Sequence, residues 1–224
     1  KKKFFNINIV IIDDGSKDNS LEILKKIKKQ NSSKKIKLTI LVHKTNLGLG
    51  YTLRDGFKYC IFNGKENDII VSMDCDNSHT IKLSYKLIME IINKNRDVVI
   101  ASRYRKNSKI KGLSFDRIFL SYMAAFIYKF FFPIKNVKDY TSGFRAIRLG
   151  VIRKAYKKNK DFFSEKGFSA SADIILKLYE FKKYINFEEI PIDLRYDLKN
   201  GESKMKILNT IFLNLKLIFK RKFF

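Results

Sequence analysis

Apolar residues along the first half of the chain alternate between short continuous runs and wider, helix-like spacing. The short runs are rich in Ile and Val and predict strands at residues 6–12, 36–42, 68–73 and 97–101. Between the runs, apolar positions three or four residues apart predict helices at residues 21–29, 51–62 and 83–92. Strands that alternate with helices are typical of an α/β domain, in which a mostly parallel sheet is flanked by helices.

The second half of the chain breaks this alternation. Residues 115–134 are strongly apolar and aromatic but contain two basic residues, which suits a helix on a membrane surface or in the core. Residues 170–181 predict another helix, and 185–192 a strand that Pro191 places at the edge of a sheet. No internal repeat or linker-like tract divides the chain. We therefore expect a single domain over residues 1–224.

The C-terminal tail carries an apolar stripe at helical spacing, flanked by Lys and Arg. The stripe consists of Met205, Leu208, Ile211, Phe212, Leu215 and Ile218. A basic amphipathic helix of this kind is typical of membrane interfaces, and we expect residues 205–224 to form one. The alternative is a helix whose stripe packs on the domain.

The charge of the chain is strongly positive. It has 47 Lys and Arg against 22 Asp and Glu, a net charge of +25. Such a charge suits an anionic membrane or nucleic acid as a partner, while compositional bias toward Lys is the alternative explanation. We expect peripheral association with a membrane and no nucleic-acid partner.

The cysteines and the N-terminal residues bear on localisation. Cys60 and Cys75 form neither a metal-ligand spacing nor a disulfide framework, which favours a reduced, cytoplasmic environment. Asn6 and Asn8 interrupt the apolar core that a signal peptide would need. No run reaches the roughly 18 apolar residues of a membrane span. We therefore expect the protein on the cytosolic (inner) face of a membrane.

Polar clusters follow three of the predicted strands. They are Asp13-Asp14, Asp74-Cys75-Asp76 and Ser102-Arg103. Because the carboxyl ends of parallel strands meet at one edge of a sheet, the clusters are expected to line one crevice. Two carboxylates one residue apart suit a hard divalent cation that shares its ligands with phosphates. The alternative for Asp74 and Asp76 is a polar loop that caps the next helix.

Several cations complete the candidate chemistry. Arg103 follows the fourth predicted strand, whereas Arg195 and Lys204 flank a glycine-containing segment near the C-terminus. Guanidinium and ammonium groups bind phosphate oxygens well. They would stabilise a departing diphosphate or hold an anionic acceptor.

The chain contains an ordered series of short motifs. They are Ile-Ile-Asp-Asp-Gly-Ser-Lys-Asp at 11–18, Asn-Leu-Gly-Leu-Gly at 46–50, Met-Asp-Cys-Asp-Asn-Ser-His at 73–79, Ser-Arg-Tyr at 102–104, Asp-Tyr-Thr-Ser-Gly-Phe-Arg-Ala at 139–146, and Glu-Ile-Pro-Ile at 189–192, which continues through Arg195 to Gly-Glu-Ser-Lys at 201–204. In this order they resemble the inverting family 2 glycosyltransferases, within them the dolichol-phosphate mannosyltransferase-like branch. The strand and helix with which that family begins have no counterpart here.

The resemblance implies the GT-A fold and a nucleotide-diphosphate sugar donor, resembling GDP-mannose or a UDP-sugar. It implies a nucleoside site that contains the Ile12 backbone, Asp13, Asp14, Asp74 and the Cys75 backbone. It implies that Mg²⁺ or Mn²⁺ is bound by Asp76, with Asp74 and Ser78 as further candidate ligands. Contacts with the diphosphate and the acceptor phosphate are implied for Arg103, Arg195 and Lys204.

The acceptor implied by the resemblance is a polyprenyl phosphate, whose oxygen is already ionised. A saccharide hydroxyl is the alternative, and it requires a carboxylate that takes the proton, for which Asp173 is the candidate. A third hypothesis, of another class, is a degenerate, non-catalytic binding module. The retained Asp74, Asp76 and Arg103 oppose it.

Overall fold

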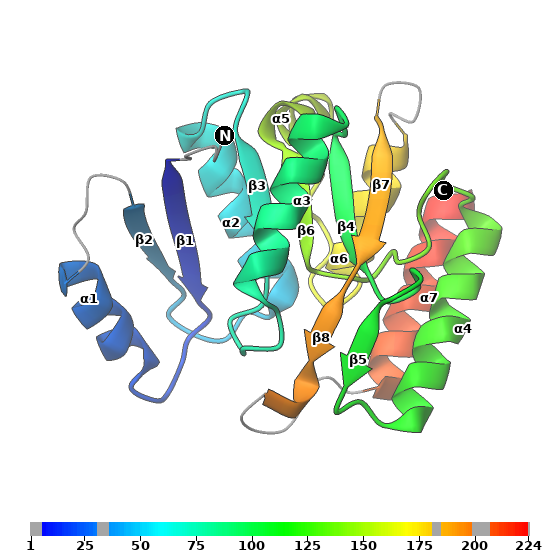
Figure 1. The fold of residues 1–224 in the computed structure, drawn as a ribbon, viewed down its shortest axis with the longest axis horizontal. Coiled ribbons are helices and arrows are strands. Elements are labelled where there is room, and N and C mark those ends of the chain that lie inside the picture. The colour runs from blue at the N-terminus through cyan, green and yellow to red at the C-terminus, as the bar shows by residue number, and fades with distance from the viewer. Residues whose placement is uncertain (1–5, 31–35, 181–184, 199–206, 224) are drawn as a thin grey trace.

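The computed structural model describes residues 6–30, 36–180, 185–198 and 207–223, and its elements follow the predicted order (Figure 1). The strands are β1 (Ile7–Asp13), β2 (Ile36–Val42), β3 (Ile69–Ser72), β4 (Val98–Ser102), β5 (Lys109–Lys111), β6 (Arg145–Arg148), β7 (Phe187–Pro191) and β8 (Asp193–Arg195). The helices are α1 (Ser20–Gln30), α2 (Leu49–Asn63), α3 (Ile81–Asn93), α4 (Phe115–Phe131), α5 (Leu149–Lys158), α6 (Ala170–Tyr179) and α7 (Ile207–Phe223), with a 3₁₀ turn at Tyr196–Leu198. The α/β class is confirmed. The elements β5, β6, β8 and α5 were not predicted.

The sheet is mixed rather than uniformly parallel. β1 pairs in parallel with β2, and a four-stranded sheet has the order β3-β6-β4-β7. In it β4 and β7 are parallel, but β6 is antiparallel to both β3 and β4. Among the described strands, none pairs with the second edge of β1 or of β3. β7 lies at an edge, as the position of Pro191 predicted.

The direction of β6 follows from how the chain enters it. The preceding residues cross the carboxyl end of β4, where the Ala101 N–H donates to the Phe144 carbonyl at 3.0 Å. A strand that begins at this edge has to run back between its neighbours, which makes β6 antiparallel to both β3 and β4. The segment before β6 is therefore placed beside the ends of β3 and β4.

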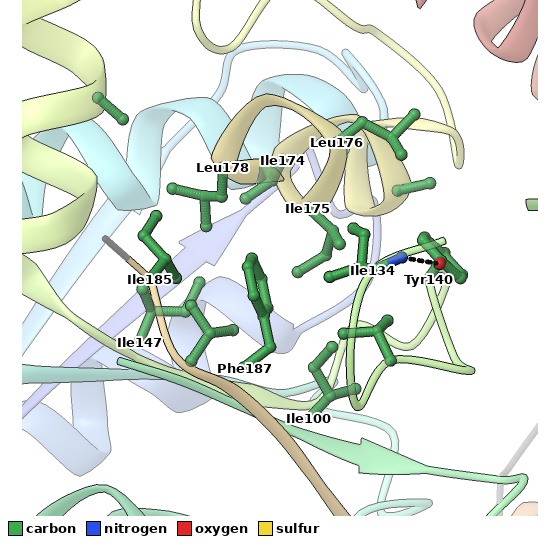
Figure 2. Packing of buried hydrophobic residues seen from close by; sticks show 14 of the residues in the cluster. Ile100, Ile134, Tyr140, Ile147, Ile174, Ile175, Leu176, Leu178, Ile185 and Phe187 are labelled. Carbon is green, nitrogen blue, oxygen red and sulfur yellow. Dashed lines mark hydrogen bonds between the residues drawn. The ribbon is translucent and has the colours of Figure 1, made fainter. Parts of the chain in front are cut away.

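The core has two layers because β4 is buried on both faces. Val98 and Ile100 belong to one apolar cluster, and Val99 and Ala101 belong to the other. On the first face, α6 contributes apolar side chains that lie over those of the sheet (Figure 2). The continuous Val and Ile content of this strand is what a strand buried on both faces requires.

The helices α4 and α7 lie side by side at one end of the molecule (Figure 1). The Tyr128 hydroxyl donates to the Asn214 side chain at 2.5 Å, and Leu217 and Ile218 are buried. The tail therefore packs one side on the domain, the alternative left open above. Met205 lies outside the described residues. Whether α7 also lies at a membrane interface stays a prediction.

The sides of α4 and α7 that do not pack on the domain expose large apolar side chains. Their exposed fractions run from 44% at Met123 to 84% at Phe115. We call these exposed side chains of two neighbouring helices together the aromatic face; they are Phe115, Phe119, Tyr122, Met123, Phe126 and Phe130 of α4 and Phe212, Leu215, Phe219 and Phe223 of α7. Across the described ranges, no helix combines the length and the apolar character needed to cross a bilayer.

The close packing of α2 on the segment before α6 gives a test of this fold. A Cβ added to Gly50 would lie 2.2 Å from the Glu165 carbonyl oxygen, whereas a Cβ at Gly56 would meet only the end of the Ile12 side chain, at 3.1 Å. We expect Gly50→Ala to lower the free energy of unfolding by about 1–3 kcal/mol through overpacking. Gly56→Ala should change it by less than about 1 kcal/mol, because the gain in helix propensity offsets a small clash. Urea denaturation of both variants checks this, and equal effects would contradict it.

Candidate functional site

The loop after β3 carries the two carboxylates singled out in the sequence. Asp74 and Cys75 are exposed and Asp76 is half-buried. The backbone N–H and the hydroxyl of Ser78 both donate to Asp76 Oδ1, at 3.1 and 2.5 Å. The Asp74 N–H donates to His79 Nδ1 at 3.1 Å. These bonds close the loop on itself and hold both carboxylates just beyond the strand.

The donor set of this loop fits a hard divalent cation. It offers two carboxylates and a hydroxyl, the oxygen ligands that Mg²⁺ and Mn²⁺ prefer. Among the described residues, no group of three or more His, Cys, Asp or Glu is arranged to hold a metal. A cation here would take few ligands from the protein and complete its shell with water and phosphate oxygens, which is usual for Mg²⁺.

A buried ion pair lies at the end of β4. Arg103 donates from Nε and Nη2 to the two carboxylate oxygens of Asp139, at 2.8 and 2.6 Å, and from Nη2 to Thr141 Oγ1 at 2.6 Å. Burial tends to raise the pKa of Asp139, but the charge and hydrogen bonds of Arg103 hold it below its usual value. The hydrogen bonds of the Arg103 side chain to described residues come from Nε and Nη2.

The residues between Asp139 and β6 connect three elements. The Ser142 hydroxyl donates to the Ala101 carbonyl at 2.8 Å, and the Ser72 hydroxyl donates to the Gly143 carbonyl at 2.7 Å. Gly143 faces Asp74, since a Cβ there would lie 3.8 Å from Asp74 Oδ1. The segment therefore joins the ends of β3 and β4 and brings the Asp74 loop to the Arg103 pair.

Asp139 and Glu189 also belong to this region, but they were not predicted from the sequence as site residues. Glu189 of β7 is buried and accepts the backbone N–H groups of Lys138 and Asp139, both at 2.6 Å. Burial raises the pKa of Glu189, although these two bonds oppose the rise. The signal was present in the sequence, because Asp139 opens a motif next to apolar residues and Glu189 lies in an apolar strand.

The structure places Arg195 beside the Asp74–Ser78 loop. Its backbone N–H donates to the Ser78 carbonyl at 3.0 Å, and Leu194 forms a β-bridge with His79. The Arg195 guanidinium binds Asp197, at 2.8 Å from Nη2. Lys204, the other predicted cation of this region, lies outside the described residues.

The cluster at the end of β1 forms a separate group. Asp14 accepts the N–H groups of Leu47 and Gly48, at 2.9 and 2.8 Å, and pairs with His43 Nδ1 at 2.7 Å. Asp14 therefore fixes the 43–48 loop, and its contact with a nucleoside stays a prediction. Asp13 is buried and accepts the Ser16 N–H at 3.3 Å. Ile12 packs toward α2, next to Gly56.

Asp173, the candidate proton acceptor for a hydroxyl substrate, forms ion pairs with two cations. Its side chain is buried, with Oδ2 at 2.9 Å from Lys177 Nζ and Oδ1 accepting from Arg221 Nε at 2.8 Å. Two cations thus bind the carboxylate, one from α6 and one from α7. Asp173 therefore ties α7 to α6, and its role as a proton acceptor stays a prediction.

Comparison with known proteins gives the following matches. Residues 1–155 match the family model described as glycosyl transferase family 2. The chain is 31% identical over 216 residues to a dolichol-phosphate mannosyltransferase of Pyrococcus furiosus; the match covers 96% of this chain but 55% of that protein, so the chain spans about half of this relative's length. It is 27% identical over 197 residues to a UDP-N-acetylglucosamine–dolichyl-phosphate N-acetylglucosaminyltransferase of Methanococcus voltae, a match that covers 84% of this chain and 75% of that protein.

Among solved structures, the chain is similar to glucosyl-3-phosphoglycerate synthase of Mycobacterium tuberculosis. The TM-score is 0.59 at 13% identity, with 95% of this chain and 68% of that chain covered. A crystal structure of the same enzyme with Mn²⁺, UDP and glucosyl-3-phosphoglycerate gives a TM-score of 0.56 at 11% identity, over 97% of this chain and 80% of that one. At sequence identities this low, the structural similarity shows a shared fold and carries no further conclusion about this chain.

The two histidines should titrate on opposite sides of the usual imidazole value. The hydrogen bond to Asp14 raises the pKa of His43 above 6.5, with Asp55 adding to it at 3.0 Å, whereas burial lowers the pKa of His79 below 6.5. We expect an NMR titration of the metal-free protein to show one imidazole above and one below 6.5. Asp14→Asn should lower only the value of His43. Two coincident titrations would contradict the described contacts.

Proposed function

The chain belongs to glycosyl transferase family 2 and has the GT-A fold, and from this premise we propose a metal-dependent, inverting transfer of a hexose. The donor is a nucleotide-diphosphate sugar, and the acceptor is a polyprenyl phosphate. The named relatives from Pyrococcus furiosus and Methanococcus voltae support a lipid phosphate, since both names contain dolichol or dolichyl phosphate.

In this proposal, the nucleotide-sugar donor is bound by the loop after β3 and by Arg103. Asp74 and Asp76 lie at the carboxyl end of the sheet, where ligands bind in open α/β folds. A divalent cation, when bound, neutralises charge on the departing diphosphate. Nη1 of Arg103 donates to the same diphosphate, and the ion pair with Asp139 holds it in position. Asp14, Arg195 and Lys204 stay in this proposal as further contacts to the donor and the acceptor phosphate.

The aromatic face is the main observation that supports a polyprenyl phosphate as the acceptor. Ten large apolar side chains on α4 and α7 would be costly to leave in water, but they suit a bilayer surface that contains a prenyl chain. Lys216 and Lys222 are exposed on α7 and attract anionic head groups. We propose that this face binds the cytosolic surface of a membrane and brings the acceptor to the site.

The reaction with this acceptor needs no strong base. An ionised phosphate oxygen of the acceptor attacks C1 of the sugar, the bond between C1 and the donor diphosphate breaks, and the nucleoside diphosphate leaves. The attack from the opposite side inverts the configuration at C1. A hydroxyl acceptor would also have to lose a proton, and Asp173 is held by Lys177 and Arg221. The phosphate acceptor is therefore favoured over the saccharide acceptor.

A transfer assay tests the metal site and the acceptor together. We expect hexose transfer to dolichyl phosphate that depends on Mg²⁺ or Mn²⁺, and little transfer to soluble saccharides. Asp76→Asn should lower the rate by about 100-fold or more, because charge on the leaving group loses its stabilisation. Glu22→Gln, the same chemical change on the exposed face of α1, is the control and should keep full activity. Full activity of Asp76→Asn with added metal would refute the metal role.

A vesicle sedimentation experiment tests the aromatic face. We expect Phe126→Ser combined with Phe212→Ser to weaken binding to vesicles that contain phosphatidylglycerol by about tenfold or more, because each Phe loses its apolar transfer energy. The matched control is Ile23→Ser combined with Ile81→Ser, which removes exposed apolar side chains from α1 and α3. Equal loss in both double variants would show that the face has no specific role.

A further inference from the structure

A second polar cleft lies away from the loop after β3. It has a volume of about 240 Å³ and is formed by the first half of α2 and residues 160–166. None of the residues discussed for the donor or the acceptor lines it. A space of this size holds several water molecules, or one small polar ligand.

Cations dominate the lining of this cleft. Arg54 and Lys58 of α2 face Lys160 and Lys166 of the opposite wall. Two carboxylates also line it, of which Glu165 is paired with Lys220 at 3.0 Å, and Arg54 is itself paired with Asp55 at 2.8 Å. Within the described part of the chain, Lys58, Lys160 and Lys166 form no ion pair. The cleft therefore has an excess of positive charge that the protein leaves unbalanced.

Aromatic rings hold these cations along the walls. The Arg54 guanidinium lies 4.3 Å from the centre of the Tyr51 ring, and the Lys160 ammonium lies 4.8 Å from that of Tyr156. Lys58 lies over the same Tyr156 ring at 5.9 Å. Such contacts restrict the conformations of the long side chains.

The walls themselves are fixed by buried contacts. Lys177 is buried and donates from Nζ to the carbonyls of Asp161 and Phe162, at 2.7 and 2.6 Å, and to the Ser164 hydroxyl at 3.0 Å. The Gly50 N–H donates to the Lys166 carbonyl at 3.0 Å, which joins the two walls. A cleft that is already organised loses little free energy to ordering when a ligand binds.

We propose that this cleft binds a small soluble anion that carries two or more phosphate groups. The ammonium groups of Lys58 on one wall and of Lys160 and Lys166 on the other match phosphate oxygens separated by a bridging oxygen. The first turn of α2 lines the same cleft, and the positive end of the helix dipole adds to the field. This site is independent of the transfer reaction and needs no metal.

Calorimetric titration with pyrophosphate in EDTA tests the site. Without metal, the carboxylates of Asp74 and Asp76 repel the anion, so binding there is suppressed. We expect saturable 1:1 binding, weakened at least tenfold in Lys58→Gln combined with Lys160→Gln, because two charges near the ligand are removed. Lys25→Gln combined with Lys28→Gln removes the same charge from the exposed α1 and should change the affinity less than twofold.

Amide chemical shifts locate the bound anion in the same samples. We expect pyrophosphate to shift the amides of Tyr51, Arg54 and residues 160–166, and inorganic phosphate to shift them less at equal concentration. Equal weakening in both double variants, shifts confined to the Asp74–Ser78 loop, or no saturable binding would each overturn the proposal. Unchanged melting temperatures of the variants show that altered binding does not come from unfolding.

Discussion

The ion pair between Arg103 and Asp139 is the interaction on which the functional edge of the sheet depends. Asp139 is fully buried and accepts from the Arg103 backbone and guanidinium and from the Ser142 N–H. Taking both charges out of water costs several kcal/mol, and only good geometry with further hydrogen bonds offsets that cost. The arrangement satisfies this condition, and it fixes the end of β4 to the segment that returns as β6.

That segment links the sheet to the helices behind it. Arg145, also buried, donates from Nη1 to the Ser171 carbonyl of α6 at 2.7 Å and from Nη2 to the Ser142 carbonyl. Through α6 the connection continues to Asp173 and from there to Arg221 of α7. A small set of buried charges thus positions the Asp74 loop, the central sheet and the helix pair with the aromatic face relative to one another. The apolar clusters supply stability without specifying this arrangement.

The sequence predicted the elements whose patterns are local. β2 begins and ends where the apolar run does, and α3 and β4 differ from their predicted bounds by one or two residues. β6 was missed because it has four residues and its direction depends on pairing with strands far along the chain. The two Asp of the loop after β3 were found because a strand ends there. The partners of Asp173 were not, since Arg221 is 48 residues away and no local pattern encodes that contact.

Among the described strands, β1 and β3 each keep one edge without a partner strand, and this makes the excess of lysine physically meaningful. An open edge presents backbone N–H and C=O groups that another chain can pair with, and Ile7 and Ile9 of β1 are partly exposed beside it. The net charge of +25 opposes such association, because two molecules repel before their edges can meet. Dissolved salt shortens the range of this repulsion to roughly 10 Å at 0.1 M ionic strength. The colloidal stability of the chain is therefore set by ionic strength as much as by its fold.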